Sequence, residues 1–295
     1  METKLVKSRR GHFFVIPHDT VIGRSLQTYG EYAEHEMMLL SHYIKSEQAV
    51  IDVGANIGTH SVFFSRQVGS KGKVLALEAQ PEIFNILKQN LSQNDCKNVK
   101  ALNTVVGDGR GEISFPPLDY SQEGNFGAFS FRVDNIGCFL PLDGRREQLK
   151  LPGIPLDDMN ILNCNLLKVD AEGMEGEILS GAIQMLHKFR PLLYLENNSR
   201  PCSSALIEQV YSLDYKAYWH VISYYRPQNF ASFPDNLFAA PLELNLFCVP
   251  KEKTLKSLGL PAVTGPDQWL PEEIELKKFE VDKLLLIAES FGFDR

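Results

Sequence analysis

Ile51-Asp52-Val53-Gly54-Ala55-Asn56-Ile57-Gly58 is the most informative segment of this sequence. It closes an apolar run of strand length (residues 49–53) and precedes THSVFFSRQV (residues 59–68), which has the pattern of a helix. Glycines between a strand and a helix let the backbone turn sharply and approach a ligand, and the helix presents its first N–H groups to that ligand. The stretch therefore predicts a ligand-binding turn at the end of a strand.

The chain on both sides of this turn alternates between strands and helices. Before it, EYAEHEMMLLSHYIK (residues 31–45) reads as a helix. After it, strands are expected at residues 73–79, 98–108, 165–170, 191–198, 215–225 and 242–250, and helices at residues 81–93, 174–189 and 203–213. Strands that are apolar on both faces and bounded by helices indicate an α/β fold with a mostly parallel sheet covered by helices on both sides.

We expect one domain over residues 1–295. It would consist of an N-terminal leader strand or hairpin and helix (1–45), a cofactor-binding core (46–200) with an insertion (109–155), and a tail (201–295) that completes the sheet and supplies loops on the acceptor side. A last helix, at about residues 272–291, is expected to pack outside the sheet.

The composition limits the partners and the compartment. The chain has 30 Lys+Arg against 37 Asp+Glu, a formal charge of −7, which disfavours a nucleic-acid or anionic membrane partner. Its five cysteines show neither zinc-finger spacing nor a disulfide pattern. No apolar stretch is long enough for a signal peptide or a membrane span, so we expect a soluble cytoplasmic protein.

An acidic residue, Glu78, ends the second strand of the α/β part, about 20 residues after the last glycine of the turn. A carboxylate at this place suits the hydroxyls of a ribose, so turn and acid together predict a nucleoside cofactor. Dinucleotide sites read GxGxxG, whereas here Asp52 occupies the first glycine position and the pattern is DxGxxxG. That carboxylate would repel a pyrophosphate and attract a cation, which favours S-adenosylmethionine over NAD.

At this point the sequence resembles the FkbM family of S-adenosylmethionine-dependent methyltransferases. The resemblance rests on four blocks: VIDVGANIGTHSVFFS (50–65), LEAQP (77–81), VVGDGRGE (105–112) and LLKVDAEGMEGEILSGA (166–182). Together they cover about residues 30–200, and the last block is the most specific of them. The resemblance implies a Rossmann-like class I methyltransferase fold, with a mostly parallel seven-stranded sheet and an antiparallel last strand.

The resemblance also implies a function, O-methylation of a hydroxyl on a sugar, a glycan or another natural product. It also implies the residues that contact the cofactor. The methionine end would be held by Asp52, Gly54, Asn56 and Gly58 and capped by Thr59, His60 and Ser61, with Asp170 beside the sulfonium. Glu78 would bind the ribose, Ala79 and Gln80 would lie beside the adenosine, and Gly107 and Asp108 would lie near the adenine.

Transfer to oxygen requires a group that removes the acceptor proton, and such a group must lie near the carboxyl ends of the fourth and fifth strands. The candidates are Asp170 and Glu172, Glu196 on the fifth strand, and His220, which could equally be a core histidine. A second mechanism is also open, in which Asp170, Glu196 and Asn197 hold Mg²⁺.

The acceptor side is less defined. Tyr218, Trp219, Tyr224, Tyr225 and Phe230 are candidates for an acceptor pocket or for the core, and Tyr29, Glu31 and Tyr32 for a lid. We expect a small-molecule or glycan acceptor, no nucleic acid and no membrane, with the oligomeric state open. Methylation of nucleic acid or protein is one alternative, although residues 170–173 read DAEG and lack the N-methylating (Asp/Asn)-Pro-Pro-(Tyr/Phe) motif. A catalytically silent binding module is another.

Overall fold

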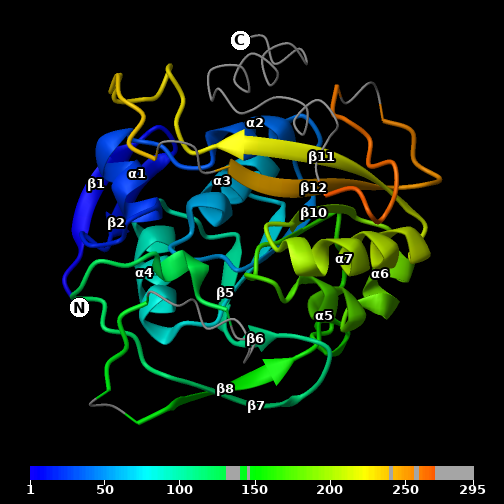
Figure 1. The fold of residues 1–295 in the computed structure, drawn as a ribbon, viewed down its shortest axis with the longest axis horizontal. Helices are drawn as coiled ribbons and strands as arrows, with labels where there is room; N and C mark the ends of the chain where they lie inside the picture. The colour runs from blue at the N-terminus through cyan, green and yellow to red at the C-terminus, as the bar shows by residue number, and fades with distance from the viewer. Residues whose placement is uncertain (131–139, 145–146, 239–241, 256–258, 270–295) are drawn as a thin grey trace.

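A seven-stranded sheet runs through the centre of the computed structural model, which describes residues 1–130, 140–144, 147–238, 242–255 and 259–269 (Figure 1). Its strands are β3 (Ala49–Val53), β4 (Lys73–Glu78), β5 (Val99–Asn103), β9 (Leu166–Val169), β10 (Leu192–Glu196), β11 (Tyr215–Ser223) and β12 (Leu242–Pro250). They lie in the order β11-β12-β10-β9-β3-β4-β5. The pairs from β10 to β5 are parallel, and β12 is antiparallel to both of its neighbours. The expected Rossmann-like class I methyltransferase fold is confirmed.

Helices cover both faces of the sheet, because consecutive strand residues point to opposite sides. Val50 of β3 packs with Phe64 in one cluster, whereas the next residue, Ile51, packs with Ile178 and Ile207 in another. The first face carries α2 (Glu34–Ser41), α3 (Thr59–Val68) and α4 (Pro81–Gln93), and the second carries α5 (Glu175–Ser180), α6 (Ile183–Phe189) and α7 (Arg200–Ser212). Burial on both faces explains why these strands read as continuous apolar runs.

The helix expected over residues 174–189 is broken into α5 and α6, and the break lies at Gly181. A Cβ atom at this position would lie 2.0 Å from the carbonyl oxygen of Gly107. The glycine therefore permits a close approach between this turn and the loop after β5. The strand expected over residues 98–108 is also divided, into β5 and the two-residue β6 (Val105–Val106).

Two smaller sheets flank the central one. β1 (Lys4–Ser8) and β2 (Gly11–Val15) form the expected N-terminal hairpin, followed by α1 (Ile22–Thr28). β6 pairs with β8 (Leu149–Ile154), which also pairs with β7 (Gly111–Phe115), within and beside the expected insertion. The expected last helix lies outside the described residues, and the division of the chain into a single domain stays a prediction.

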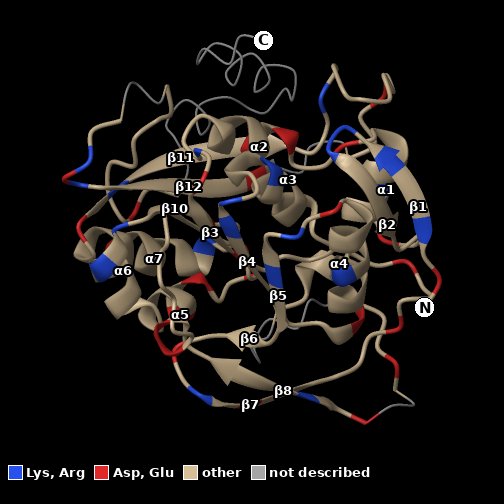
Figure 2. Cartoon of the chain, turned by 180° about the vertical axis from the view of Figure 1, so that it is seen from behind, with Lys and Arg blue, Asp and Glu red and all other residues tan. Residues whose placement is uncertain are grey.

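Charged side chains are distributed around the fold. Figure 2 shows acidic and basic segments interspersed along the described chain, with neither kind confined to one side. Within the same residues, no helix combines the length and the apolar character that crossing a bilayer requires.

Asn90 of α4 joins the N-terminal hairpin to the turn after β3. Its fully buried amide accepts a hydrogen bond from the Phe14 N–H and donates to the carbonyl oxygens of Phe14 and Ile57. Four residues later, Asn94 makes a similar pair of bonds with the backbone of His12, but near the solvent. The two asparagines therefore form a matched buried and exposed pair.

We expect Asn90→Ala to lower the free energy of unfolding by about 2–4 kcal/mol, because it leaves three buried backbone groups without partners. Asn94→Ala should cost less than about 1 kcal/mol, since water can replace its bonds. Urea unfolding monitored by circular dichroism measures both, and equal losses would show that Asn90 has no special role in docking the hairpin.

Candidate functional site

A cavity opens at the carboxyl ends of β3, β4, β9 and β10, where parallel strands bring their following loops together. Its empty volume, including the part open to solvent, is about 1130 Å³, which is the size of a small-molecule site. Its walls come from the turn after β3, the ends of β4 and β9, the loop at residues 125–129 and the start of β12.

The turn after β3 packs against the end of β9 at Gly54. The residue has a φ of +75°, and a Cβ atom there would lie 1.7 Å from the Asp170 carbonyl oxygen. The Asp170 N–H donates to Val53, and the N–H groups of Gly54 and Ala55 donate to Leu77 of β4. Only glycine allows this approach, so the turn is fixed between two strands.

Glu78, at the end of β4, faces the cavity with a buried carboxyl group. One carboxylate oxygen accepts from the Asn56 N–H at 2.8 Å, and the other accepts from the Gln80 N–H at 2.7 Å. Burial raises the pKa of Glu78 to about 7, although these backbone hydrogen bonds oppose the rise. The side chain is thus held in place beside the turn.

Lys168 is a buried lysine on β9, directly between carboxyl groups. It stands opposite Asp52 in the register of β3 and β9. Its Nζ lies 3.0 Å from an Asp170 oxygen and 3.8 Å from an Asp52 oxygen. Burial lowers the pKa of Lys168, but Asp170 and Asp52 raise it by more, so that its pKa lies above the usual value. The other oxygen of Asp52 accepts a hydrogen bond from Ser61 at 2.6 Å.

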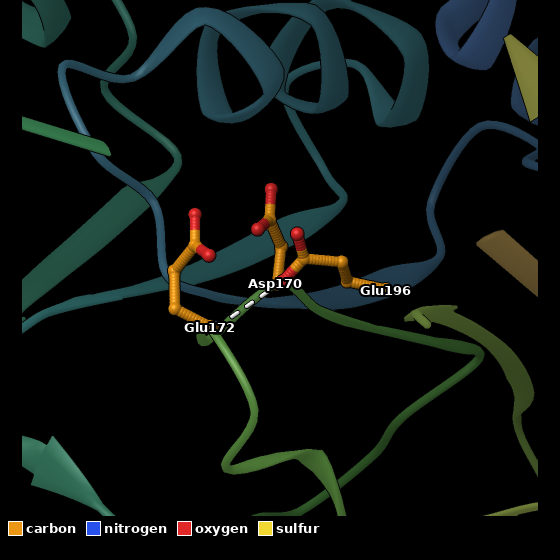
Figure 3. Close-up of side chains that lie close together, drawn as sticks. All are labelled: Asp170, Glu172 and Glu196. Atoms are coloured by element: carbon orange, nitrogen blue, oxygen red, sulfur yellow. Dashed lines mark hydrogen bonds between the residues drawn. The ribbon is translucent and has the colours of Figure 1, made fainter. Parts of the chain in front are cut away.

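Three carboxyl groups gather at the ends of β9 and β10 (Figure 3). Asp170, Glu172 and Glu196 each offer an oxygen, and these oxygens lie within 4.8 Å of one another. Glu196 accepts hydrogen bonds from the Glu172 N–H at 3.2 Å and from the Asn198 amide at 2.6 Å. Glu172 has a φ of +51°, a backbone conformation that non-glycine residues seldom adopt and that clusters at functional sites.

Burial and repulsion from neighbouring carboxylates make Glu172 and Glu196 hard to ionise. Burial, and then the charge of Asp170, raises the pKa of Glu172 to about 8. Burial and the neighbouring Glu172 raise the pKa of Glu196 well above its usual value. Such shifts mark candidate functional sites and favour the binding of a cation, which would relieve the repulsion.

The predicted cofactor residues divide into two groups. Those that line the cavity are Gly54, Asn56, Thr59, His60, Glu78, Ala79, Gln80 and Asp170. The others are not among the described residues that line the cavity: Asp52, Gly58, Ser61, Gly107 and Asp108. In the part of the chain that the structure describes, Thr104–Val106 line the wall where Gly107 and Asp108 were expected. Asp108 lines a separate hollow beside α5 and α7.

Two of the predicted catalytic or metal residues point elsewhere. His220 is a buried core histidine, whose Nδ1 lies 2.8 Å from the Tyr194 hydroxyl and whose pKa is lowered by burial to about 3. The Asn197 amide donates to Ser203 of α7 at 2.9 Å. Among carboxylate ligands, the structure brings together Asp170, Glu172 and Glu196, whereas Asn197 lies outside the described lining of the cavity.

Sequence reasoning missed Lys168, Asn198 and Glu243, all of which line the cavity. Glu243 carried a readable signal, because it and Asn245 alternate with apolar residues in β12 and so share one face of a buried strand. The lid and pocket candidates Tyr32 and Tyr224 both line the cavity and stack with ring centroids 5.9 Å apart. Trp219 instead lies in the core.

The residues present fit a cationic nucleoside cofactor. Five carboxyl-bearing residues are among the described residues that line the cavity: Glu78, Asp170, Glu172, Glu196 and Glu243. Among the described lining residues, Lys168 is the only lysine or arginine. One buried oxygen of Asp52 and one of Glu243 have no hydrogen-bond partner in the described chain. This donor set suits a ligand that carries positive charge and hydroxyl groups.

Comparison with known proteins agrees with this chemistry. The family profile described as "Methyltransferase FkbM domain" matches residues 52–216, more than half of the chain. Methyltransferase sdnD of Sordaria araneosa is 28% identical over 162 residues, which is 47% of this chain and 61% of that protein. Hexuronic acid methyltransferase AglP of Haloferax volcanii is 29% identical over 148 residues, 50% of this chain and 55% of that protein. The matches thus span little more than half the length of these relatives.

Solved methyltransferase structures resemble the chain more distantly. The FkbM methyltransferase of Methylobacillus flagellatus has a TM-score of 0.45 at 17% identity, covering 68% of this chain and 44% of that one. An S-adenosylmethionine-dependent O-methyltransferase of Thermotoga maritima has a TM-score of 0.47 at 12% identity, covering 86% of this chain and 79% of that one.

The raised pKa of Glu172 makes the ligand-free protein less stable as the pH rises. Between the usual glutamate pKa of 4.5 and about 8, the folded chain holds more protons at Glu172 than the unfolded chain does, so the free energy of unfolding falls across this window. We expect Glu172→Gln to stabilise the ligand-free protein by about 1–3 kcal/mol at pH 8 and to change little at pH 4. Urea unfolding at both pH values measures this.

The matched control is Glu123→Gln, which removes one exposed carboxylate and should leave the free energy of unfolding within about 0.5 kcal/mol at both pH values. If Glu172→Gln destabilised the protein equally at pH 4 and pH 8, the proposed repulsion would not exist.

Proposed function

This chain belongs to the FkbM family of S-adenosylmethionine-dependent methyltransferases, and we propose that it methylates a hydroxyl group of a sugar, a glycan or a related natural product. The observation that carries the proposal is the group of three carboxylates, Asp170, Glu172 and Glu196, at the strand ends beside the Gly54 turn. A hydroxyl acceptor needs a base for its proton, and these groups supply candidates. The name of the relative AglP supports a sugar acceptor.

The cofactor would lie across the ends of β3 and β4. Glu78 would bind the ribose hydroxyls, and the turn at residues 54–60 would hold the methionine end, with Asp52 and Ser61 as a buried support behind it. Ala79 and Gln80 would lie beside the adenosine, and Thr104–Val106 would take the place proposed for Gly107 and Asp108. When bound, S-adenosylmethionine supplies a methyl group on a sulfonium leaving group, so the protein must only align the acceptor and remove its proton.

Glu172 is the carboxylate best suited to take this proton. Asp170 already pairs with Lys168, and Glu196 already accepts from the Glu172 N–H and the Asn198 amide. No described residue donates a hydrogen bond to the Glu172 carboxylate, and its raised pKa makes it a stronger base than an exposed glutamate. Asp170 and Glu196 would orient the acceptor hydroxyl.

Replacing the carboxylate that is proposed to bind the ribose should weaken cofactor binding. We expect Glu78→Gln to raise the Kd for S-adenosylhomocysteine at least about tenfold, because the amide group would face the N–H donors of Asn56 and Gln80. Isothermal titration calorimetry measures the Kd, and Glu112→Gln, an exposed change on β7, is the control. An unchanged Kd for Glu78→Gln would mean that the cofactor lies elsewhere.

Removing the base should change the rate and its pH dependence. In the ligand-free protein the pKa of Glu172 is about 8. A base works only when deprotonated, so kcat should rise with pH and reach a plateau at or below that value, since a bound cation lowers the pKa of the carboxyl group. We expect Glu172→Gln to lower kcat about 100-fold or more and to abolish the rise of kcat with pH. The Kd for S-adenosylhomocysteine should change less than about threefold.

The acceptor class is tested with labelled S-adenosylmethionine and a panel of sugars, glycosides and polyketide alcohols. Label in a hydroxyl of one of these supports the proposal, whereas label in purified RNA or in protein would overturn it. A reaction abolished by EDTA and restored by Mg²⁺ would place a metal ion among Asp170, Glu172 and Glu196 and remove Glu172 from its role as the direct base.

A further inference from the structure

The acceptor end of the cavity holds more carboxyl groups than the cofactor and Lys168 could balance if all of these groups were ionised. Bound S-adenosylmethionine would bring a net charge of +1, because its sulfonium and ammonium groups are positive and its carboxylate group is negative. Apart from Glu78 at the ribose end, the described lining holds Asp170, Glu172, Glu196 and Glu243, against Lys168 alone among lysines and arginines. At least one further positive charge would fit the site.

Glu243 is the carboxyl group that the proposed reaction does not use. It lies near the start of β12, is 4% exposed and lines the cavity. Its Oε2 atom is buried and has no hydrogen-bond partner in the described chain. Burial, and then the charges of Glu36 and Asp170, raises its pKa well above the usual value. A buried acceptor without a donor is costly unless a ligand supplies the donor.

Two aromatic rings line the same cavity as this carboxyl group. Tyr32 and Tyr224 line the same cavity and are stacked, with their planes 19° apart. Glu243 is the charged group with the largest effect on both hydroxyls, since after burial it raises the pKa of each most. Tyrosine rings together with a carboxylate attract an ammonium group.

Resting on the proposed function, we infer that the acceptor carries a positively charged amino group, which Glu243 binds beside Tyr32 and Tyr224 while the acceptor hydroxyl faces Glu172. The acceptor class is thus an amine-bearing alcohol such as an amino sugar. A uronic acid, by contrast, would bring a further negative charge to four carboxyl groups.

A divalent metal ion fits this end of the cavity less well than an amine. The oxygens that converge for a metal belong to Asp170, Glu172 and Glu196, and the group does not include Glu243. Asp170 also accepts a hydrogen bond from the Lys168 ammonium group at 3.0 Å. A metal ion there would leave the Glu243 oxygen without a partner, whereas an ammonium group supplies three N–H donors.

The test compares three matched ligands with the protein saturated with S-adenosylhomocysteine: the methyl glycosides of glucosamine, glucose and glucuronic acid. Calorimetry or ligand-observed NMR gives each Kd, with EDTA present. We expect the glucosamine glycoside to bind at least about tenfold more tightly than the glucose glycoside, and the glucuronic acid glycoside to bind most weakly. Glu243→Gln should reduce the preference for the amine at least about fivefold, and Glu123→Gln should leave it unchanged.

Each outcome decides the inference. Equal binding of the three glycosides, tighter binding of the glucuronic acid glycoside, no binding of any, or a preference that appears only when Mg²⁺ replaces EDTA would overturn it. The proposed function is judged separately by the Kd of S-adenosylhomocysteine itself. If S-adenosylhomocysteine binds and the amine preference is absent, only the acceptor class is wrong, whereas failure to bind would remove the basis of both.

Discussion

The buried ammonium group of Lys168, set between carboxyl groups, is the interaction on which the site depends. β9 is the strand between β3 and β10, so a residue on it can reach groups at the ends of both neighbours. Lys168 bonds to Asp170 and lies 3.8 Å from Asp52. It thereby joins the strand that bears the glycine turn to the strand end that bears the acids. Without this cation, the carboxyl groups would face one another in a poorly solvated pocket with nothing to offset their repulsion.

The single positive charge of Lys168 does not balance all of the carboxyl groups around the cavity. The excess of carboxyl groups determines the chemistry of the site. Carboxyl groups that are buried and crowded have raised pKa values, which makes them stronger bases and better partners for a cation. The same features cost stability in the ligand-free chain, as is common where function requires an unfavourable arrangement. The proposed cofactor sulfonium, the proposed base and the proposed acceptor amine would all depend on this one group of carboxyl side chains.

The sequence predicted what is local and left open what depends on tertiary contacts. The strand, turn and helix around Gly54 could be read directly, because each uses short-range spacing and backbone freedom. Asp170, Glu172 and Glu196 were placed together because parallel strands end at one edge. Asn197 and Asn198 are adjacent in the chain, and spacing alone could not tell that the first points to α7 and the second to Glu196.

Other positions required the whole fold. Glu243 and Lys168 are single charges in apolar strands, and only the strand order brings them to one cavity. His220 is an opposite case, since a polar residue in an apolar strand proved to be satisfied by Tyr194. Gly181 lies within the single helix predicted over residues 174–189, but the structure divides this helix there, where the Gly107 backbone approaches. Each of these depends on contacts between segments far apart in the chain.

The raised pKa values of Glu172, Glu196 and Glu243 imply that the ligand-free cavity holds protonated carboxyl groups, which lose protons when a cation binds. Calorimetry of S-adenosylmethionine binding at pH 7, in buffers of different ionisation enthalpy, measures the number of protons released. We expect S-adenosylmethionine to release protons on binding, because its sulfonium lowers the raised pKa values of these carboxyl groups. S-adenosylhomocysteine, which lacks this charge, should release fewer. Binding of both ligands without proton release, or with equal release, would contradict this expectation.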